Sequence, residues 1–255
     1  MLLILLTALQ WLPDLESAPR FDRSRQAVTL PLLQGRAGPM TFGLCAGAQG
    51  RLILPFGYVE DGFVDVVGNV VLIEDHLDYN DLLDPGIGIT LEFDILFRPP
   101  PPRPGGPPWE DTPALGIYVA FERDWFGGDD AENGALRIEP DDWEVTSIFG
   151  GFKAQGTVNG PLYGDLRLGL GWVQYPALDA NLSFGGNSGR GEIFEESDGF
   201  AMEARMHFGW RLGPLAFNFG FGGRFMVGPD AGAATTYDPG PLWTIEFEVG
   251  AELNF

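Results

Sequence analysis

The chain has one cysteine and two histidines among its 255 residues, and no uninterrupted run of about 18 apolar residues. A single thiol, Cys45, excludes an internal disulfide, so this residue is interpreted as a small filler side chain. So few thiol and imidazole groups leave no credible zinc or iron site, and we expect no metal and no cofactor. The lack of a long apolar run excludes membrane-spanning helices, although 45% of the residues are hydrophobic.

Basic side chains are scarce as well. The 15 Lys and Arg residues stand against 36 Asp and Glu residues, which gives a formal net charge of −21. A chain of this sign repels the phosphates of nucleic acids, so nucleic-acid binding is excluded.

The end of the chain alternates strictly between apolar and polar residues. The apolar positions are Trp243, Ile245, Phe247, Val249, Ala251, Leu253 and Phe255, and Glu246, Glu248 and Glu252 lie among the residues between them. Successive side chains of a β-strand point to opposite faces, so one face of this strand is apolar and the other carries carboxylates. At a tilt near 40°, thirteen such residues span roughly 33 Å, enough to cross the apolar band of a membrane barrel.

Similar alternation recurs upstream. With the last strand it defines eight segments, which are residues 41–56, 87–98, 115–124, 143–158, 162–173, 200–212, 215–227 and 243–255. Unpaired backbone groups are costly in lipid, so such strands continue until the sheet closes. The sequence therefore predicts an all-β fold, a closed antiparallel transmembrane β-barrel of about eight strands. Residues 63–73 are predicted to form a further hairpin around Gly68-Asn69 that stands above the membrane, because its arms are shorter than the roughly 9–11 residues that a membrane-spanning strand needs; the alternative is a barrel of ten strands.

The connections alternate in length, as expected for short periplasmic turns and long outer loops. The long ones are residues 57–86, 126–142, 176–199 and 228–241, which hold 21 acidic and two basic side chains. Their simplest interpretation is solvated, disordered acidic loops. Divalent cations bridging these carboxylates to phosphorylated lipid are an alternative partner. The proline-rich insertion 99–113 breaks the alternation and is interpreted as a stiff, extended spacer.

Charges of both signs share the face opposite the apolar one. An eight-stranded barrel encloses little more than its own side chains, so we expect these charges to pair and plug the interior; the alternative is conduction. The predicted lumen charge network consists of Arg51, Glu92, Asp94, Arg98, Asp165, Arg167, Glu203, Arg205, His207, Arg211, Arg224, Glu246, Glu248 and Glu252, and Glu122 lies on the same face.

The alternation that ends at Phe255 resembles the C-terminal signature of bacterial outer-membrane β-barrels, which their assembly machinery recognises. Phe247, Val249, Leu253 and Phe255 carry this assembly signal. A soluble, lipocalin-like barrel would reverse the two faces, and the terminal Phe favours the membrane form. The chain resembles the eight-stranded kinds that include outer-membrane protein A and outer-membrane protein W.

That resemblance implies a bacterial outer-membrane location, with membrane lipid and the barrel-assembly machinery as partners. It also implies a structural or surface-interaction role without catalysis. One alternative is a narrow channel for a small or hydrophobic solute, and another is a lipid A-modifying enzyme. Deacylase barrels carry a His-x-Ser pair, whereas His207-Phe208-Gly209 has glycine in place of the serine. We therefore predict no catalytic residue.

The first 40 residues are expected to precede the barrel. Residues 1–20 are predicted to be an export signal, atypical because no Lys or Arg precedes the apolar stretch Met1 to Leu12. The alternative is an apolar appendage without a targeting role. Residues 21–40 are predicted to be a periplasmic linker, and residues 41–255 the barrel.

Overall fold

The computed structural model describes residues 28–29, 41–60, 63–66, 68–73, 76–98, 113–159, 161–236 and 239–254. The predicted export signal, nearly all of the linker and residues 99–112 lie outside this part of the chain. No helix among the described residues is long and apolar enough to cross a membrane.

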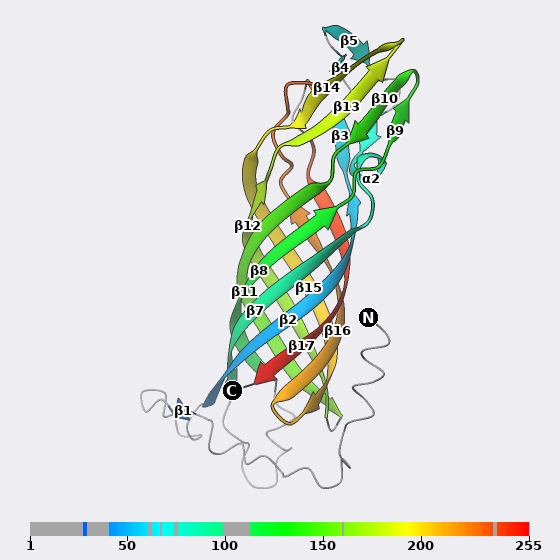
Figure 1. Ribbon diagram of the computed structural model, residues 1–255. Helices are drawn as coiled ribbons and strands as arrows, with labels where there is room; N and C mark the ends of the chain where they lie inside the picture. Colours follow the sequence, from blue (N-terminus) through cyan, green and yellow to red (C-terminus); the bar gives the residue numbers. More distant parts are fainter. Residues whose placement is uncertain are drawn as a thin grey trace, which may run out of the picture.

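Eight long strands form a closed barrel (Figure 1). They are β2 (Thr41–Phe56), β7 (Gly86–Arg98), β8 (Ala114–Phe126), β11 (Trp143–Asn159), β12 (Leu162–Tyr175), β15 (Ser197–Leu212), β16 (Leu215–Met226) and β17 (Leu242–Asn254). Each pairs antiparallel with its neighbours in chain order, and the last strand, β17, pairs with β2 from Trp243↔Phe56 to Asn254↔Cys45. Closure leaves no open edge in the wall, as backbone in lipid requires. The eight predicted segments and their antiparallel closure are confirmed.

The two faces of the wall are those that the alternation predicted. On β8, for example, Phe121 is 49% exposed on the outside, whereas the next residue, Glu122, is 2% exposed on the inside. The same contrast separates Phe247, 51% exposed, from Glu246, which is fully buried. The exterior is therefore apolar and the interior charged, the reverse of a soluble barrel.

Most of the short strands lie beyond the end of the barrel that is opposite the C-terminus (Figure 1). A four-stranded sheet contains β9 (Ala131–Asn133), β10 (Leu136–Pro140), β13 (Leu178–Phe184) and β14 (Asn187–Phe194). A separate hairpin joins β4 (Phe63–Val66) to β5 (Asn69–Leu72). Because β4 and β5 pair only with each other, they do not enter the barrel wall, and the ten-strand alternative is wrong.

The four-stranded sheet and the β4–β5 hairpin are here called the extension. Further short elements lie between the extension and the barrel or at the opposite end of the barrel. β3 (Tyr58–Glu60) pairs with β6 (Leu77–Asp78), and the single helical turn α2 (Tyr79–Leu82) follows. At the other end of the barrel, β1 (Val28–Thr29) pairs with the start of β2.

The described parts of the long connections are folded. Gly185 and Gly186, both with positive φ, close the hairpin between β13 and β14, a conformation that glycine adopts without strain. Residues 231–234 bond to β14 on one side, and Ala234 also accepts a hydrogen bond from the Asp65 N–H of β4. Solvated, disordered loops were therefore the wrong expectation, because paired strands and a common apolar core order these segments.

Candidate functional site

The interior of the barrel is filled with charged side chains from all eight strands. Nine carboxylates, five cations and one histidine are buried there, and they are Glu92, Asp94, Glu122, Asp124, Asp165, Glu203, Glu246, Glu248, Glu252, Arg51, Lys153, Arg167, Arg205, Arg224 and His207. Burying a charge is costly unless it is paired, so the geometry of these pairs decides what the interior can do.

The half of the lumen nearer the extension is built around Glu122 of β8. Its two carboxylate oxygens lie 2.7 Å from Arg51, 2.6 Å from Arg205 and 3.0 Å from Arg224. Two of these arginines, Arg51 and Arg224, also pair with Asp124 two residues further along the strand. One carboxylate thus joins guanidinium groups from three other strands.

Glu246 of β17 completes this upper cluster. It lies 3.2 Å from Arg51 and 3.3 Å from Arg205, and it also pairs with Arg224. Glu203 binds Arg205 at 2.6 Å and accepts a hydrogen bond from the Tyr118 hydroxyl group. Every guanidinium of the cluster therefore faces at least two carboxylates, an arrangement that leaves little room for a solute.

The lower half of the lumen is organised by Lys153, the chain's one lysine. Its ammonium group donates to Glu92 at 3.1 Å and to Glu252 at 3.0 Å, and it also bonds to Asp94. Arg167 lies beside it and pairs with Glu92 and with Asp165 at 3.0 Å.

His207 connects the two halves. Its Nδ1 lies 2.9 Å from Asp165, and its Nε2 bonds to Glu248, which also pairs with Arg205 at 3.1 Å. Both ring nitrogens thus face carboxylates, and neither is open to take a proton from a nucleophile. This arrangement fits a structural histidine within a charge network, since a general base needs one nitrogen directed at the group it activates.

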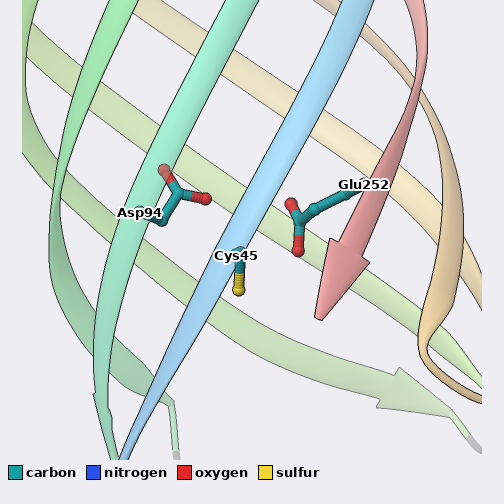
Figure 2. Close-up of side chains that lie close together, drawn as sticks. All are labelled: Cys45, Asp94 and Glu252. Carbon is teal, nitrogen blue, oxygen red and sulfur yellow. The ribbon is translucent and has the colours of Figure 1, made fainter. Parts of the chain in front are cut away.

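Cys45, Asp94 and Glu252 lie together near the lower end of the barrel, on three adjacent strands (Figure 2). Their potential ligand atoms all fall within 4.8 Å of one another, and among the described residues this is the one group with such a spacing. Lys153 already bonds to both carboxylates, and the Cys45 thiol lies 3.4 Å from the Asn254 side chain. The ammonium group therefore supplies the positive charge that a cation would bring.

The predicted network differs from the observed one at a few positions. Arg211 is only partly buried, lies 4.5 Å over the Tyr163 ring and bonds to Gln155. The side chain of Arg98 lies outside the described residues. Two members were missed, Asp124 and Lys153, both of which share the inward parity of their strands.

The inward position of Phe149 explains why the sequence pattern did not assign Lys153 to the lumen network. Phe149 is buried inside the barrel, 6.0 Å beneath the guanidinium of Arg205, and so breaks the polar pattern of the inward face of β11. Counting parity from Ile148 and Phe152 alone would have placed Lys153 on the inside.

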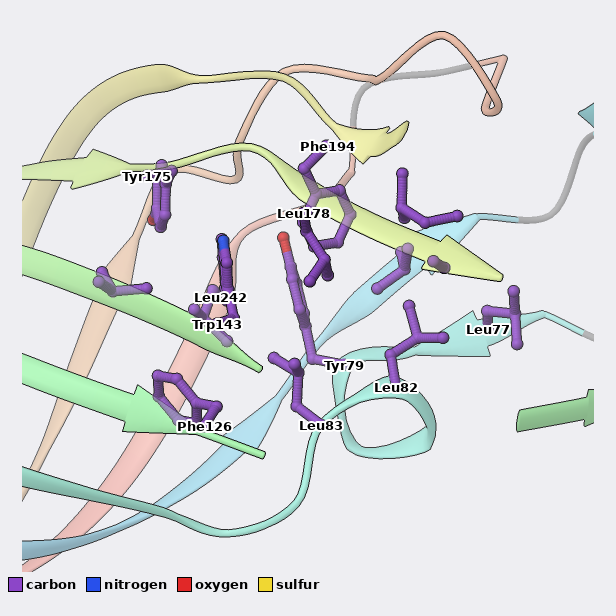
Figure 3. Close-up of a cluster of buried hydrophobic side chains, with 14 of the residues drawn as sticks. Leu77, Tyr79, Leu82, Leu83, Phe126, Trp143, Tyr175, Leu178, Phe194 and Leu242 are labelled. Atoms are coloured by element: carbon purple, nitrogen blue, oxygen red, sulfur yellow. The ribbon is translucent and has the colours of Figure 1, made fainter. Parts of the chain in front are cut away.

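A cluster of aromatic and aliphatic side chains, here called the aromatic cap, closes the outer end of the lumen (Figure 3). Trp143 is at its centre. Its ring is stacked on that of Tyr175, with 5.4 Å between the ring centroids, and its centroid lies 5.4 Å from that of Phe194 and 6.3 Å from that of Phe126. Tyr79 packs on Phe194 from the side of α2. The sequence pattern did not predict that the lumen is covered by the aromatic cap as well as filled by charges. The residues of the cap come from segments that the alternation places in separate loops and at the ends of strands.

The polar atoms of the aromatic cap are also paired. Trp143 Nε1 donates to the carbonyl of Pro176 at 2.9 Å, Tyr175 to that of Val227 at 2.7 Å, and Tyr79 to that of Gly240 at 3.1 Å. Burial raises the pKa of Tyr79 well above its usual value, since the phenolate would lie in an apolar site. The cap is thus a packed core with satisfied hydrogen bonds.

Two arginines form ion pairs with carboxylates on the acidic surface of the extension. Arg190 of β14 bonds to Asp141 and lies 3.3 Å from Asp179, and these hydrogen bonds raise its pKa. Arg137 of β10 binds Asp130 at 2.7 Å and Glu139 at 3.0 Å, and its pKa is raised for the same reason. The carboxylates of these loops are therefore partly neutralised by the chain itself.

No protein-family model matches the chain, and no curated protein sequence matches it. Among solved structures it is similar to Neisserial surface protein A, with 11% identity and a TM-score of 0.39 over 84% of this chain and 97% of the other.

Two further structures are similar to a comparable degree. Ail, the attachment invasion locus protein of Yersinia pestis, has 14% identity and a TM-score of 0.34 over 84% of this chain and 97% of its own. A major outer membrane protein from Thermus thermophilus has 9% identity and a TM-score of 0.34 over 82% of this chain and 99% of its own.

Proposed function

We propose that this protein is a non-enzymatic barrel of the bacterial outer membrane, closed to solutes, which holds a folded β-extension outside the membrane. The observation that carries the proposal is the direction of the side chains. Large apolar residues are exposed all around the wall, among them Phe219 at 60% and Leu170 at 59%, while charges fill the interior. Such a surface would be a severe aggregation liability in water, whereas it matches the apolar band of a membrane barrel.

The rims of the wall support the same location. Trp172 and Trp243 are exposed toward the extension, and Trp210 is exposed near the opposite end of the wall. Aromatic girdles at both interfaces are typical of outer-membrane barrels. In this proposal the exposed face of β17, with Phe247, Val249 and Leu253, is the part read by the assembly machinery; Phe255 lies outside the described residues.

A closed interior favours a structural or surface role over transport. The charge network crosses the lumen in two layers, and the aromatic cap covers its outer end. A solute would need to break several buried ion pairs and displace Trp143. Channel function therefore lacks support in the geometry, and the pairing of His207 with two carboxylates gives no support to lipid modification.

The β4–β5 hairpin is the part of the extension best suited to contact another molecule. Its outward side chains include Phe63, Val70 and Leu72, which are 43%, 68% and 57% exposed, while Val64 and Val71 on the other face are buried. Exposed apolar residues on a paired strand, outside the membrane-facing wall, are typical of interaction surfaces.

Three measurements test the proposal. Folded and boiled samples should migrate differently on a gel, because a closed barrel stays compact until it is heated, and the folded protein should insert into lipid vesicles. In planar bilayers the inserted protein should show no discrete conductance steps. Failure to insert would overturn the membrane role, and regular channel openings would overturn the closed lumen.

A further inference from the structure

The β4–β5 hairpin, at the tip of the extension, is covered along its β4 edge (Figure 1). The N–H of Asp65 donates to the carbonyl of Ala234 at 2.9 Å, and the hydroxyl group of Thr236 donates to the carbonyl of Phe63 at 2.9 Å. On the other side of the hairpin, β5 pairs with no further strand among the described residues. The fold therefore leaves the outer edge of β5 exposed.

The backbone groups that point to this outer edge follow from the register of the hairpin. Asp65 is paired with Val70, and Phe63 is paired with Leu72. Opposite residues of antiparallel strands exchange either both backbone hydrogen bonds or none. Because Asp65 and Phe63 direct their backbone groups away from β5, Val70 and Leu72 direct theirs away from β4. The N–H and C=O groups of Val70 and Leu72 thus have no backbone partner among the described residues.

The side chains of β5 do not hinder pairing with a further strand. Natural sheets commonly protect an exposed edge with proline, with charged residues or with a bulge. By contrast, β5 consists of Asn69, Val70, Val71 and Leu72. Val70, Leu72 and the neighbouring Phe63 are exposed on one face, whereas Val71 and Val64 are buried in the core on the other. The hairpin is therefore fixed with an apolar, uncharged edge toward the outside.

The outer edges of the four-stranded sheet differ from the edge of β5. Gly232 and Ala234 donate backbone hydrogen bonds to β14 and so cover its outer edge. The edge strand on the opposite side, β9, has only three residues, and one of them is the exposed Glu132. An uncovered, apolar edge such as that of β5 is the arrangement by which a sheet takes up an extended strand from another chain.

Charge decides which kind of strand fits this edge. The connection 57–86, which contains the hairpin, has eight acidic residues and no Lys or Arg. Asp65 is exposed opposite Val70 on the outward face of the hairpin. The two basic residues of the long connections, Arg137 and Arg190, are already paired with carboxylates. A second copy of this acidic chain would be repelled, whereas a basic segment would be attracted.

We propose that β5 binds an extended, basic segment of another protein by strand addition. The backbone of the partner pairs with Val70 and Leu72, and its apolar side chains lie beside those of Phe63, Val70 and Leu72. Its basic side chains complement the acidic surface of the extension. This inference rests on the proposed surface role of the hairpin and names the chemistry of its partner.

The test uses the full protein refolded in phosphatidylcholine vesicles and a labelled synthetic peptide in which valine alternates with lysine. We expect saturable binding to these vesicles, not to empty ones, and weaker binding as the salt concentration rises. A peptide whose valines are N-methylated keeps its charges but cannot donate to the edge. It should bind about tenfold more weakly or worse, because backbone hydrogen bonds are lost. No binding of the first peptide, or equal binding of the two, would overturn strand addition.

Val70→Pro tests the edge on the protein itself. Proline lacks the N–H that points to the partner, and it removes no hydrogen bond of the hairpin because the Val70 N–H points away from β4. The variant should bind the valine–lysine peptide about tenfold more weakly or worse. Val70→Thr is the matched control, since it keeps the N–H and a β-branched side chain, and it should bind much better than the proline variant. Equal affinities of the two variants would contradict backbone pairing at β5.

The basic character of the partner has its own test. A peptide in which valine alternates with glutamate should not bind, and binding equal to that of the lysine peptide would overturn the basic partner. Dimers of the protein alone that Val70→Pro abolishes would show that a second copy occupies the edge, and would overturn it as well. A protein that fails to insert into vesicles would contradict the proposed function, whereas an inserted protein that does not bind the lysine peptide contradicts only this inference.

Discussion

Arg205 of β15 reaches across the lumen to Glu122 of β8, with its Nη2 atom 2.6 Å from Glu122 Oε1. The two strands are not neighbours, because β11 and β12 lie between them in the wall. The same carboxylate also binds Arg51 and Arg224, so a single residue ties four strands together through the interior. The barrel is therefore braced from within as well as by its backbone ladder.

Glu122→Gln tests this brace. The substitution leaves three buried guanidinium groups with one fewer negative charge, and removing one partner of a buried ion pair costs about 3–5 kcal/mol. We expect that loss in urea titrations of the folded protein in vesicles. Phe121→Leu, an outward change on the same strand, should cost much less, and equal effects of the two would contradict the importance of the network.

Phe247→Arg tests which face meets lipid. Phe247 is 51% exposed on the wall, and an arginine on the lipid face near the midplane of a membrane costs about 2–4 kcal/mol. Phe247→Leu at the same position should be tolerated. Insertion into vesicles, followed by the gel shift on heating, measures both variants. An arginine variant that inserts as well as the leucine variant would show that this position does not face the apolar band.

Trp143→Ala tests the aromatic cap. Replacing a buried tryptophan by alanine costs about 3–5 kcal/mol, and here it removes the stacking with Tyr175 and the contact with Phe194. We expect the extension to become sensitive to protease while the membrane barrel stays resistant. Leu72→Ala, at an exposed position of β5, is the control and should leave protease resistance unchanged.

Conductance measurements on the same tryptophan variant distinguish the two barriers in the lumen, which are the aromatic cap and the charge network. Trp143→Ala opens the outer end only, and the ion pairs around Glu122 and Lys153 remain. The variant should therefore be as silent in planar bilayers as the unmodified protein. Discrete openings would mean that the cap is the sole barrier and that the charged interior conducts.

The aromatic cap should also loosen at high pH through Tyr79. Burial raises the pKa of Tyr79 in the folded protein above the value of about 10 that it has when unfolded. The folded state thus binds the proton more tightly, so this contribution is complete below pH 10 and is lost progressively above it. Protease resistance of the extension should fall as the pH rises beyond that point. Tyr79→Phe, which cannot ionise, should fall less, and identical pH profiles would contradict this role.

Alternation along the chain was sufficient to predict the eight strands of the wall, the faces of most of their residues and the closed barrel. The period-two pattern places Phe247 outside and Glu246 inside whatever the neighbouring strands do, and backbone pairing in lipid then demands closure. Such information is local, because each residue's face follows from its position within its own strand.

Contacts between distant residues could not be predicted in this way. Lys153 lies 59 residues from Asp94 and 99 from Glu252 in the chain, yet binds both, and the register of several strands decides that meeting. The pairing of β10 with β13 and the stacking of Trp143 on Tyr175 likewise join segments that the sequence presents as separate loops and strand ends. The sequence by itself determined which side chains of the wall point outward and which point into the lumen. Only the tertiary structure decided how the lumen charges pair and that the outer loops fold into a cap, because both depend on strands brought together by closure of the barrel.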